Sequence, residues 1–147
     1  MTVTVNKETI LKNVFKNFYD LIVAISGFST IVWPTFPDNV LNAKGDYPVI
    51  VVNSPEIKWD PFTFKKNIVE GTIVIDVFTN TPSETDTKAD LINNKIETSK
   101  KTLADVGVRQ VNLDSTNTDM ASHGKIKVHL KTITFNFKFY FTNTSAY

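Results

Sequence analysis

The chain contains no cysteine among its 147 residues. Disulfide bonds, thiolate nucleophiles and cysteine-ligated metal sites are therefore excluded. Only five glycines are present and they are dispersed, so we expect no glycine-rich loop that cradles a phosphate group. The formal net charge is +1, which gives the protein no overall field to attract nucleic acid or an acidic partner.

Long apolar runs are also lacking. The longest, at residues 21–25 and 49–52, are far too short to cross a bilayer, so we expect no membrane partner. The first seven residues contain no basic segment followed by an apolar core, and we expect no signal peptide. The length, with 41% hydrophobic and 21% charged residues, is typical of one globular domain over residues 1–147.

What the sequence does contain is a long alternating stretch at residues 125–141. Its apolar residues fall on one parity before Lys131 and on the other parity after Thr132. A period of two predicts an extended strand with one apolar face. We expect a single bulge at Lys131 and Thr132, because one inserted residue would keep both apolar sets on the same core. Two strands joined by a turn are the alternative, but no Gly, Pro or Asn lies at the join.

The other elements are expected from helical spacing, β-branched runs and turn residues. In order, they are a helix at 6–27, a short strand at 29–33, strands at 47–53 and 67–79, a second helix at 81–105, and a short strand at 108–113. Residues 54–66 and 114–124 are expected to be flexible loops, and a long hairpin tip is the alternative for 114–124. This order predicts the α+β class, with a mostly antiparallel sheet of about four to five strands and two helices packed on it.

The loop at 54–66 is too aromatic for a plain linker. Either it folds back over the sheet, or it presents aromatic side chains to a partner. The candidate subunit or partner interface consists of Trp59, Phe62, Phe64, Lys65 and Lys66.

The polar residues of the long strand are rich in lysine. The candidate basic face consists of Lys125, Lys127, His129 and Lys131, with Lys138 and Tyr140 further along. Such a face could bind the phosphates of a nucleic acid. Alternatively, the lysines protect an edge strand against aggregation, and the near-neutral net charge favours this second interpretation.

Candidate catalytic groups are scarce. His123 and His129 share a parity and could bind a metal with Glu70 or Asp76 as a third ligand, but no strong spacing signature accompanies them. The sequence also lacks a nucleophile elbow. We therefore expect no catalytic residue, no metal site and no cofactor, and a protein that is not an enzyme.

Several stretches together resemble the tail-terminator, or tail-completion, proteins of long-tailed bacteriophages. An amphipathic N-terminal helix precedes Tyr-Pro-Val-Ile-Val-Val at 47–52. Gly-Thr-Ile-Val-Ile-Asp-Val-Phe-Thr follows at 71–79, then a helix entered through Ser-Glu-Thr at 83–85, and finally a long strand. The likeness covers most of the chain, apart from residues 54–66 and 114–124.

This resemblance implies a structural virion protein that assembles in the host cytoplasm. Members of the family form a ring, typically a hexamer, that caps the tail tube and joins it to the head. The implied partners are therefore further copies of the chain, the tail tube protein and a head-completion or connector protein, with no specific nucleic acid. A small nucleic-acid-binding module that uses the lysine-bearing strand is the alternative.

Overall fold

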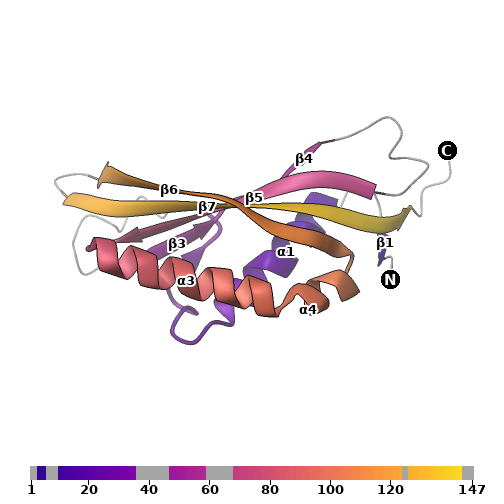
Figure 1. Cartoon of the computed structure of the whole chain (residues 1–147), viewed down its shortest axis with the longest axis horizontal. Coiled ribbons are helices and arrows are strands. Elements are labelled where there is room, and N and C mark those ends of the chain that lie inside the picture. Colours follow the sequence, from indigo (N-terminus) through magenta and orange to yellow (C-terminus); the bar gives the residue numbers. More distant parts are fainter. Residues whose placement is uncertain (1–2, 6–9, 36–46, 59–67, 124–125, 144–147) are drawn as a thin grey trace.

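The computed structural model describes residues 3–5, 10–35, 47–58, 68–123 and 126–143 (Figure 1). The α+β class is confirmed, with three helices and more strands than expected among these described residues. The helices are α1 (Ile10–Val23), α3 (Pro82–Thr98) and α4 (Lys100–Asp105). The strands are β1 (Val3–Val5), β2 (Val32–Trp33), β3 (Val49–Val52), β4 (Glu56–Lys58), β5 (Ile68–Thr79), β6 (Val108–His123) and β7 (Ile126–Asn143).

The strands form one mixed, mostly antiparallel sheet. Its order is β1-β7-β5-β3-β2, while β4 also pairs with β5 and β6 also pairs with β7. The two parallel pairs are β1 with β7 and β2 with β3. Because β7 pairs with β5 on one side and with β6 on the other, it is an internal strand of the sheet.

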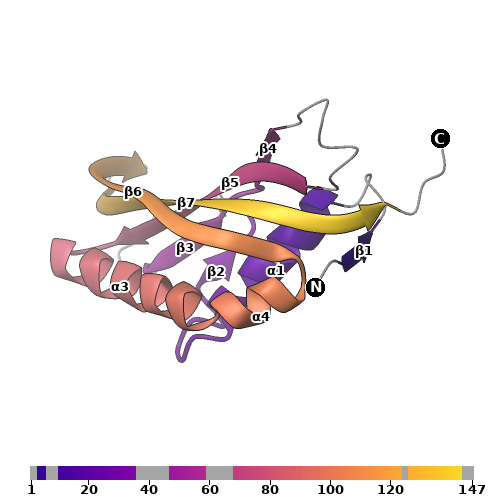
Figure 2. The same cartoon turned by 45° about the vertical axis from the view of Figure 1, so that its right-hand side comes forward.

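All three helices lie against the same face of the sheet, which we call the helix-covered face (Figures 1 and 2). The odd-numbered residues of β5 and of the second half of β7 point into this face, because residues of one parity share one side of a strand. The buried side chains of α1 recur at spacings of four, as its sequence predicts. They are Ile10, Val14, Phe18 and Ile22.

The second expected helix is interrupted once. Thr81 caps its start, since the Thr81 hydroxyl accepts a hydrogen bond from the backbone N–H of Glu84 at 3.2 Å. Ser99 has φ −104° and ψ 10°, which ends α3 and begins α4. Gly107 follows α4 with a φ of 93°, as expected for a glycine that lets the chain leave a helix.

The predicted bulge in the long strand is wrong. β7 pairs residue for residue with β5 from His129 to Tyr140, so Lys131 and Thr132 keep the regular alternation. The register shifts lie instead in β6, between Arg109 and Asn112 and between Leu113 and Ser115. The change of parity therefore places the two apolar sets of β7 on opposite faces of the sheet.

The face away from the helices, which we call the outer face, carries its own small apolar cluster. Val128 of β7 is fully buried there, against Tyr47, Val49 and Val51, and Phe78 packs beside them. The sheet is therefore partly covered on its second face as well.

Both expected loops contain strand. Residues 114–123 are not a mobile loop but the second half of β6, which forms a long hairpin with β7 from Ser115 to His123, in line with the hairpin alternative. Residues 114–120 lack apolar alternation because their side chains are largely exposed on both faces. Within the expected loop at 54–66, Glu56–Lys58 forms strand β4.

Candidate functional site

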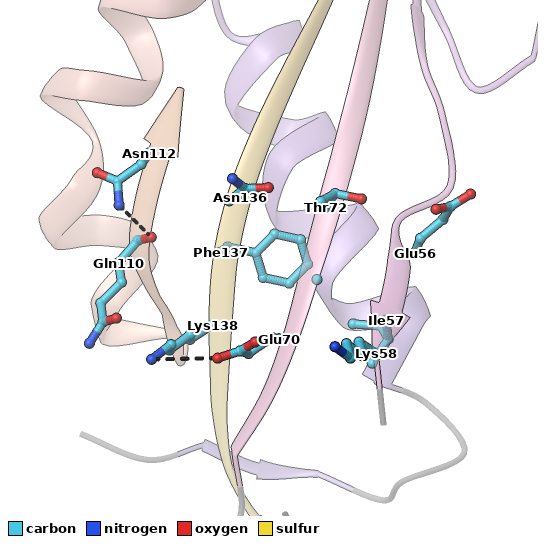
Figure 3. A pocket seen from close by; sticks show the side chains of 11 residues that line it. Glu56, Ile57, Lys58, Glu70, Thr72, Gln110, Asn112, Asn136, Phe137 and Lys138 are labelled. Atoms are coloured by element: carbon cyan, nitrogen blue, oxygen red, sulfur yellow. Dashed lines mark hydrogen bonds and ion pairs between the residues drawn. The ribbon is translucent and has the colours of Figure 1, made fainter. Parts of the chain in front are cut away.

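A broad hollow of about 690 Å³ lies on the outer face, where it crosses β4, β5, β7 and β6 (Figure 3). It is lined mainly by carboxylate, ammonium, amide and hydroxyl groups. Strand pairing arranges its outward side chains in two rows across the sheet. One row is Glu56, Thr72, Asn136 and Asn112, and the other is Lys58, Glu70, Lys138 and Arg109.

Gly71 allows a close approach between strands at the centre of this region. A Cβ atom at Gly71 would lie 2.6 Å from the carbonyl oxygen of Glu56 and 2.8 Å from the Cζ atom of Phe137. Both distances are shorter than real carbon contacts, so only glycine lets β4 and the Phe137 ring approach β5 here. Phe137 in turn contacts Phe18 of α1, with ring centroids 5.7 Å apart.

The charges around the hollow are of both signs and partly neutralise one another. The Nζ atom of Lys138 lies 3.6 Å from Oε1 of Glu70, and the Arg109 guanidinium lies 5.4 Å from the centroid of the Tyr140 ring. Both members of the Lys138–Glu70 pair are substantially exposed, so this ion pair stabilises the fold little. A surface of this kind can contact another protein through hydrogen bonds and balanced charges.

The four strands beneath the hollow are bounded on their two sides by different edge strands. At one side lies β6, whose only strand partner among the described residues is β7. At the other side lies β4, and further along that side β2, each with one strand partner in the described part of the chain. These edges carry backbone groups that another strand can pair with.

The aromatic residues expected at an interface lie outside the described residues. Trp59, Phe62, Phe64, Lys65 and Lys66 belong to the segment between Lys58, the last residue of β4, and Ile68, the first residue of β5. Their role in an interface stays a prediction.

The structure divides the expected basic face between the two faces of the sheet. Lys127, His129 and Lys131 share the parity that points to the helix-covered face, where Lys131 pairs with Asp86 of α3. Lys138 and Tyr140 have the other parity and lie on the outer face, and Lys125 lies outside the described residues. Lys131 and Lys138 do not protect an edge either, because β7 has strand partners on both sides along this part of its length.

The candidate metal ligands are also separated. His129 points to the helix-covered side, while Glu70 and Asp76 are on the outer face. Both oxygens of Asp76 already accept hydrogen bonds, from Asn53 at 2.9 Å and from Thr132 at 2.7 Å. Among the described residues, no group of three or more His, Asp or Glu side chains could hold a metal ion, and the side chain of His123 is outside that description.

The sequence interpretation missed β6 as an edge strand, and with it Leu113. This side chain is 49% exposed beside α3, although it is apolar. Polar residues surround Leu113 in the sequence, so no periodic signal set it apart. The register shifts that place it arise from the pairing of β6 with β7, which the sequence does not encode locally.

No protein-family model matches the chain, and no curated protein matches it. In the described part of the chain, no helix combines the length and apolar character needed to cross a membrane.

Proposed function

We propose that this protein is the tail terminator of a long-tailed bacteriophage, a structural subunit that assembles head to tail into a ring. The observation that carries this proposal is the pair of unlike edges, β6 on one side of the sheet and β4 on the other. A ring requires two different surfaces that fit each other when a subunit is repeated by rotation. Two free edges of one sheet are such a pair, because strands add to each other through backbone hydrogen bonds.

The order of elements supports the proposal. The stretches that carry the resemblance are α1, β3, β5, α3 and β7, and in the structure they form the centre of the sheet together with the helices that cover it. The ring would cap the tail tube and present its opposite surface to the head-completion or connector protein. By the resemblance, we expect six subunits and incorporation into the virion tail.

The outer face suits a contact between proteins. Its two rows of side chains carry two acidic and three basic residues among amides and a hydroxyl, so a neutral or mixed-charge protein surface can approach without strong repulsion.

Two measurements test the proposal. Light scattering over a range of concentrations, followed by negative-stain imaging, should show rings of one size. In a second experiment, the protein is added to polymerising tail tube protein, and the lengths of the tubes are measured. We expect tubes to stop growing, with the protein at their ends, whereas an unrelated globular protein of similar mass should have no effect.

A ring that forms only on a tube end would appear as a monomer in the first measurement and would still stop growth in the second. Tubes that lengthen equally with and without the protein would exclude the terminator role. A protein that stays monomeric and is also absent from the tube ends would exclude the ring.

A further inference from the structure

A groove of about 280 Å³ lies between α3 and the free edge of β6. Its floor is apolar, formed by Ile96, Val111 and Phe135, and Leu113 lies at its side with half of its surface exposed. The Glu97 and Lys100 side chains on the α3 side form an ion pair at 3.0 Å. The groove therefore has an apolar interior and a polar rim, as sites for extended polypeptide segments commonly have.

Two polar features of this region favour a polypeptide occupant. Next to the groove, no strand pairs with the outer edge of β6 in the described part of the chain, so this edge can accept an added strand, although the backbone carbonyl of Gln110 already accepts from the side-chain amide of Asn112 at 3.2 Å. Asn93, which lines the groove, has a buried Oδ1 atom that accepts no hydrogen bond within the described structure. A buried acceptor of this kind is stabilised by a donor such as a backbone N–H.

Strand direction identifies which segment can add at β6. The four strands β4, β5, β7 and β6 are antiparallel at each step. Four is an even number, so β4 runs opposite to β6. When a second copy continues the sheet with the same face outward, its β4 meets β6 as another antiparallel neighbour.

Position in the sheet favours β4 over β2, which lies on the same side. Across the sheet, Ile57 of β4 pairs with Gly71 of β5, and Gly71 pairs with Phe137 of β7. This row of paired residues continues to β6 next to the groove. The corresponding row from β2 runs from Val32 through Ile50, Val77 and Lys131 to Thr118, several residues away from the groove.

We propose that β4 of one copy adds to β6 of the next, with Ile57 seated beside Leu113 in the groove under α3. This proposal rests on the head-to-tail ring proposed above and assigns its subunit contact. Ile57 is the one apolar residue of β4, and it points to the helix-covered side, as Leu113 does. Glu56 and Lys58 then remain on the outer face, where the two rows of polar side chains continue from one subunit into the next.

Cysteine crosslinking tests this contact directly, because the natural chain has no cysteine. In this register Ile57 and Leu113 are diagonal neighbours about 7–8 Å apart, which is too far for a disulfide but within reach of a short bismaleimide. The variant that carries both Ile57→Cys and Leu113→Cys should give a ladder of covalent oligomers with this reagent, up to the full ring. An equimolar mixture of the two single variants should give crosslinked dimers. Either single variant alone should give no crosslink, since the two edges that meet are unlike.

A crosslink in the Leu113→Cys variant alone would overturn the proposal, because it would show that two β6 strands pair with each other. Rings that form normally, with no crosslink in the double variant, would also overturn it while leaving the proposed function intact. Wild-type protein that neither forms rings nor stops tube growth would instead overturn the proposed function itself.

A second measurement uses charge in place of crosslinking. Leu113→Glu should reduce the ring to monomers in light scattering at concentrations where the wild type is assembled, with an unchanged circular dichroism spectrum. Met120→Glu is the matched control, because Met120 is 55% exposed on the same side of the same strand but outside the groove. Equal effects of the two substitutions on the oligomer mass would contradict the assignment.

Discussion

The two faces of the sheet differ in their apolar content, in their charged side chains and in the helices that cover them. The helix-covered face is built from the odd positions of β5 and β7 and from three helices, and its residues form one large apolar cluster. The outer face uses the even positions of the same two strands and carries polar rows, one hollow and a cluster of four buried residues. The helix-covered face therefore supplies most of the apolar packing that stabilises the fold. The outer face instead leaves polar and charged side chains exposed, where a partner protein can contact them.

The largest expected effect lies on the helix-covered face. Phe18 is fully buried and contacts Phe137, so Phe18→Ala should lower the free energy of unfolding by about 3–5 kcal/mol. Chemical denaturation measures this change. Leu11→Ala on the same helix is the control, because Leu11 is 45% exposed and its truncation should cost less than about 0.5 kcal/mol. Equal losses for the two variants would mean that this face does not dominate stability.

An intermediate effect is expected on the outer face at Asp76. Its carboxylate accepts hydrogen bonds from both Asn53 and Thr132, which join β3, β5 and β7. Asp76→Ala leaves both donors without this acceptor and should cost about 1–3 kcal/mol in denaturation experiments. Asp76→Asn keeps an oxygen acceptor and should cost less. An alanine variant as stable as the wild type would show that this network is not a stabilising element.

The smallest effect is expected at the ion pair beside the hollow. Glu70→Gln removes the attraction to Lys138, but the Lys138 and Glu70 side chains are 38% and 62% exposed, so solvent screens the pair and the free energy of unfolding should change by less than about 0.5 kcal/mol. The same denaturation curves, recorded at low and high salt, measure it. A loss above 1 kcal/mol would show that the outer face contributes more to stability than the comparison allows.

Most of the helix-covered face could be predicted from the sequence, because its apolar residues recur with a clear period. The spacing of Val14, Phe18 and Ile22 indicates a helix, and the alternation from Ile133 to Phe139 indicates a strand. The outer face was harder to predict. Val128 belongs to a second apolar cluster, and a change of parity alone does not distinguish a bulge from a second cluster.

The candidate site was predictable only in part. The exposure of Leu113 and the free edge of β6 both depend on how β6 pairs with β7, and the local sequence does not indicate this pairing. The polar run around Thr116 has the composition of a loop. At Gly71, the carbonyl oxygen of Glu56 and the ring of Phe137 approach β5 closely. The identity of both neighbours depends on register, which only the assembled sheet determines.

The position of β7 has a further consequence, for the order in which the chain can fold. Each strand that pairs with β7 precedes it in the sequence, and β1 pairs with its far end, Val3 with Phe141. During synthesis, β5 and the helices emerge before the strand that completes their apolar layer. The apolar side chains of this layer therefore stay exposed until β7 has been synthesised. The many contacts between residues distant in the sequence also favour slow folding. This interval is also the one in which the unpaired edge of β5 can pair with a wrong partner.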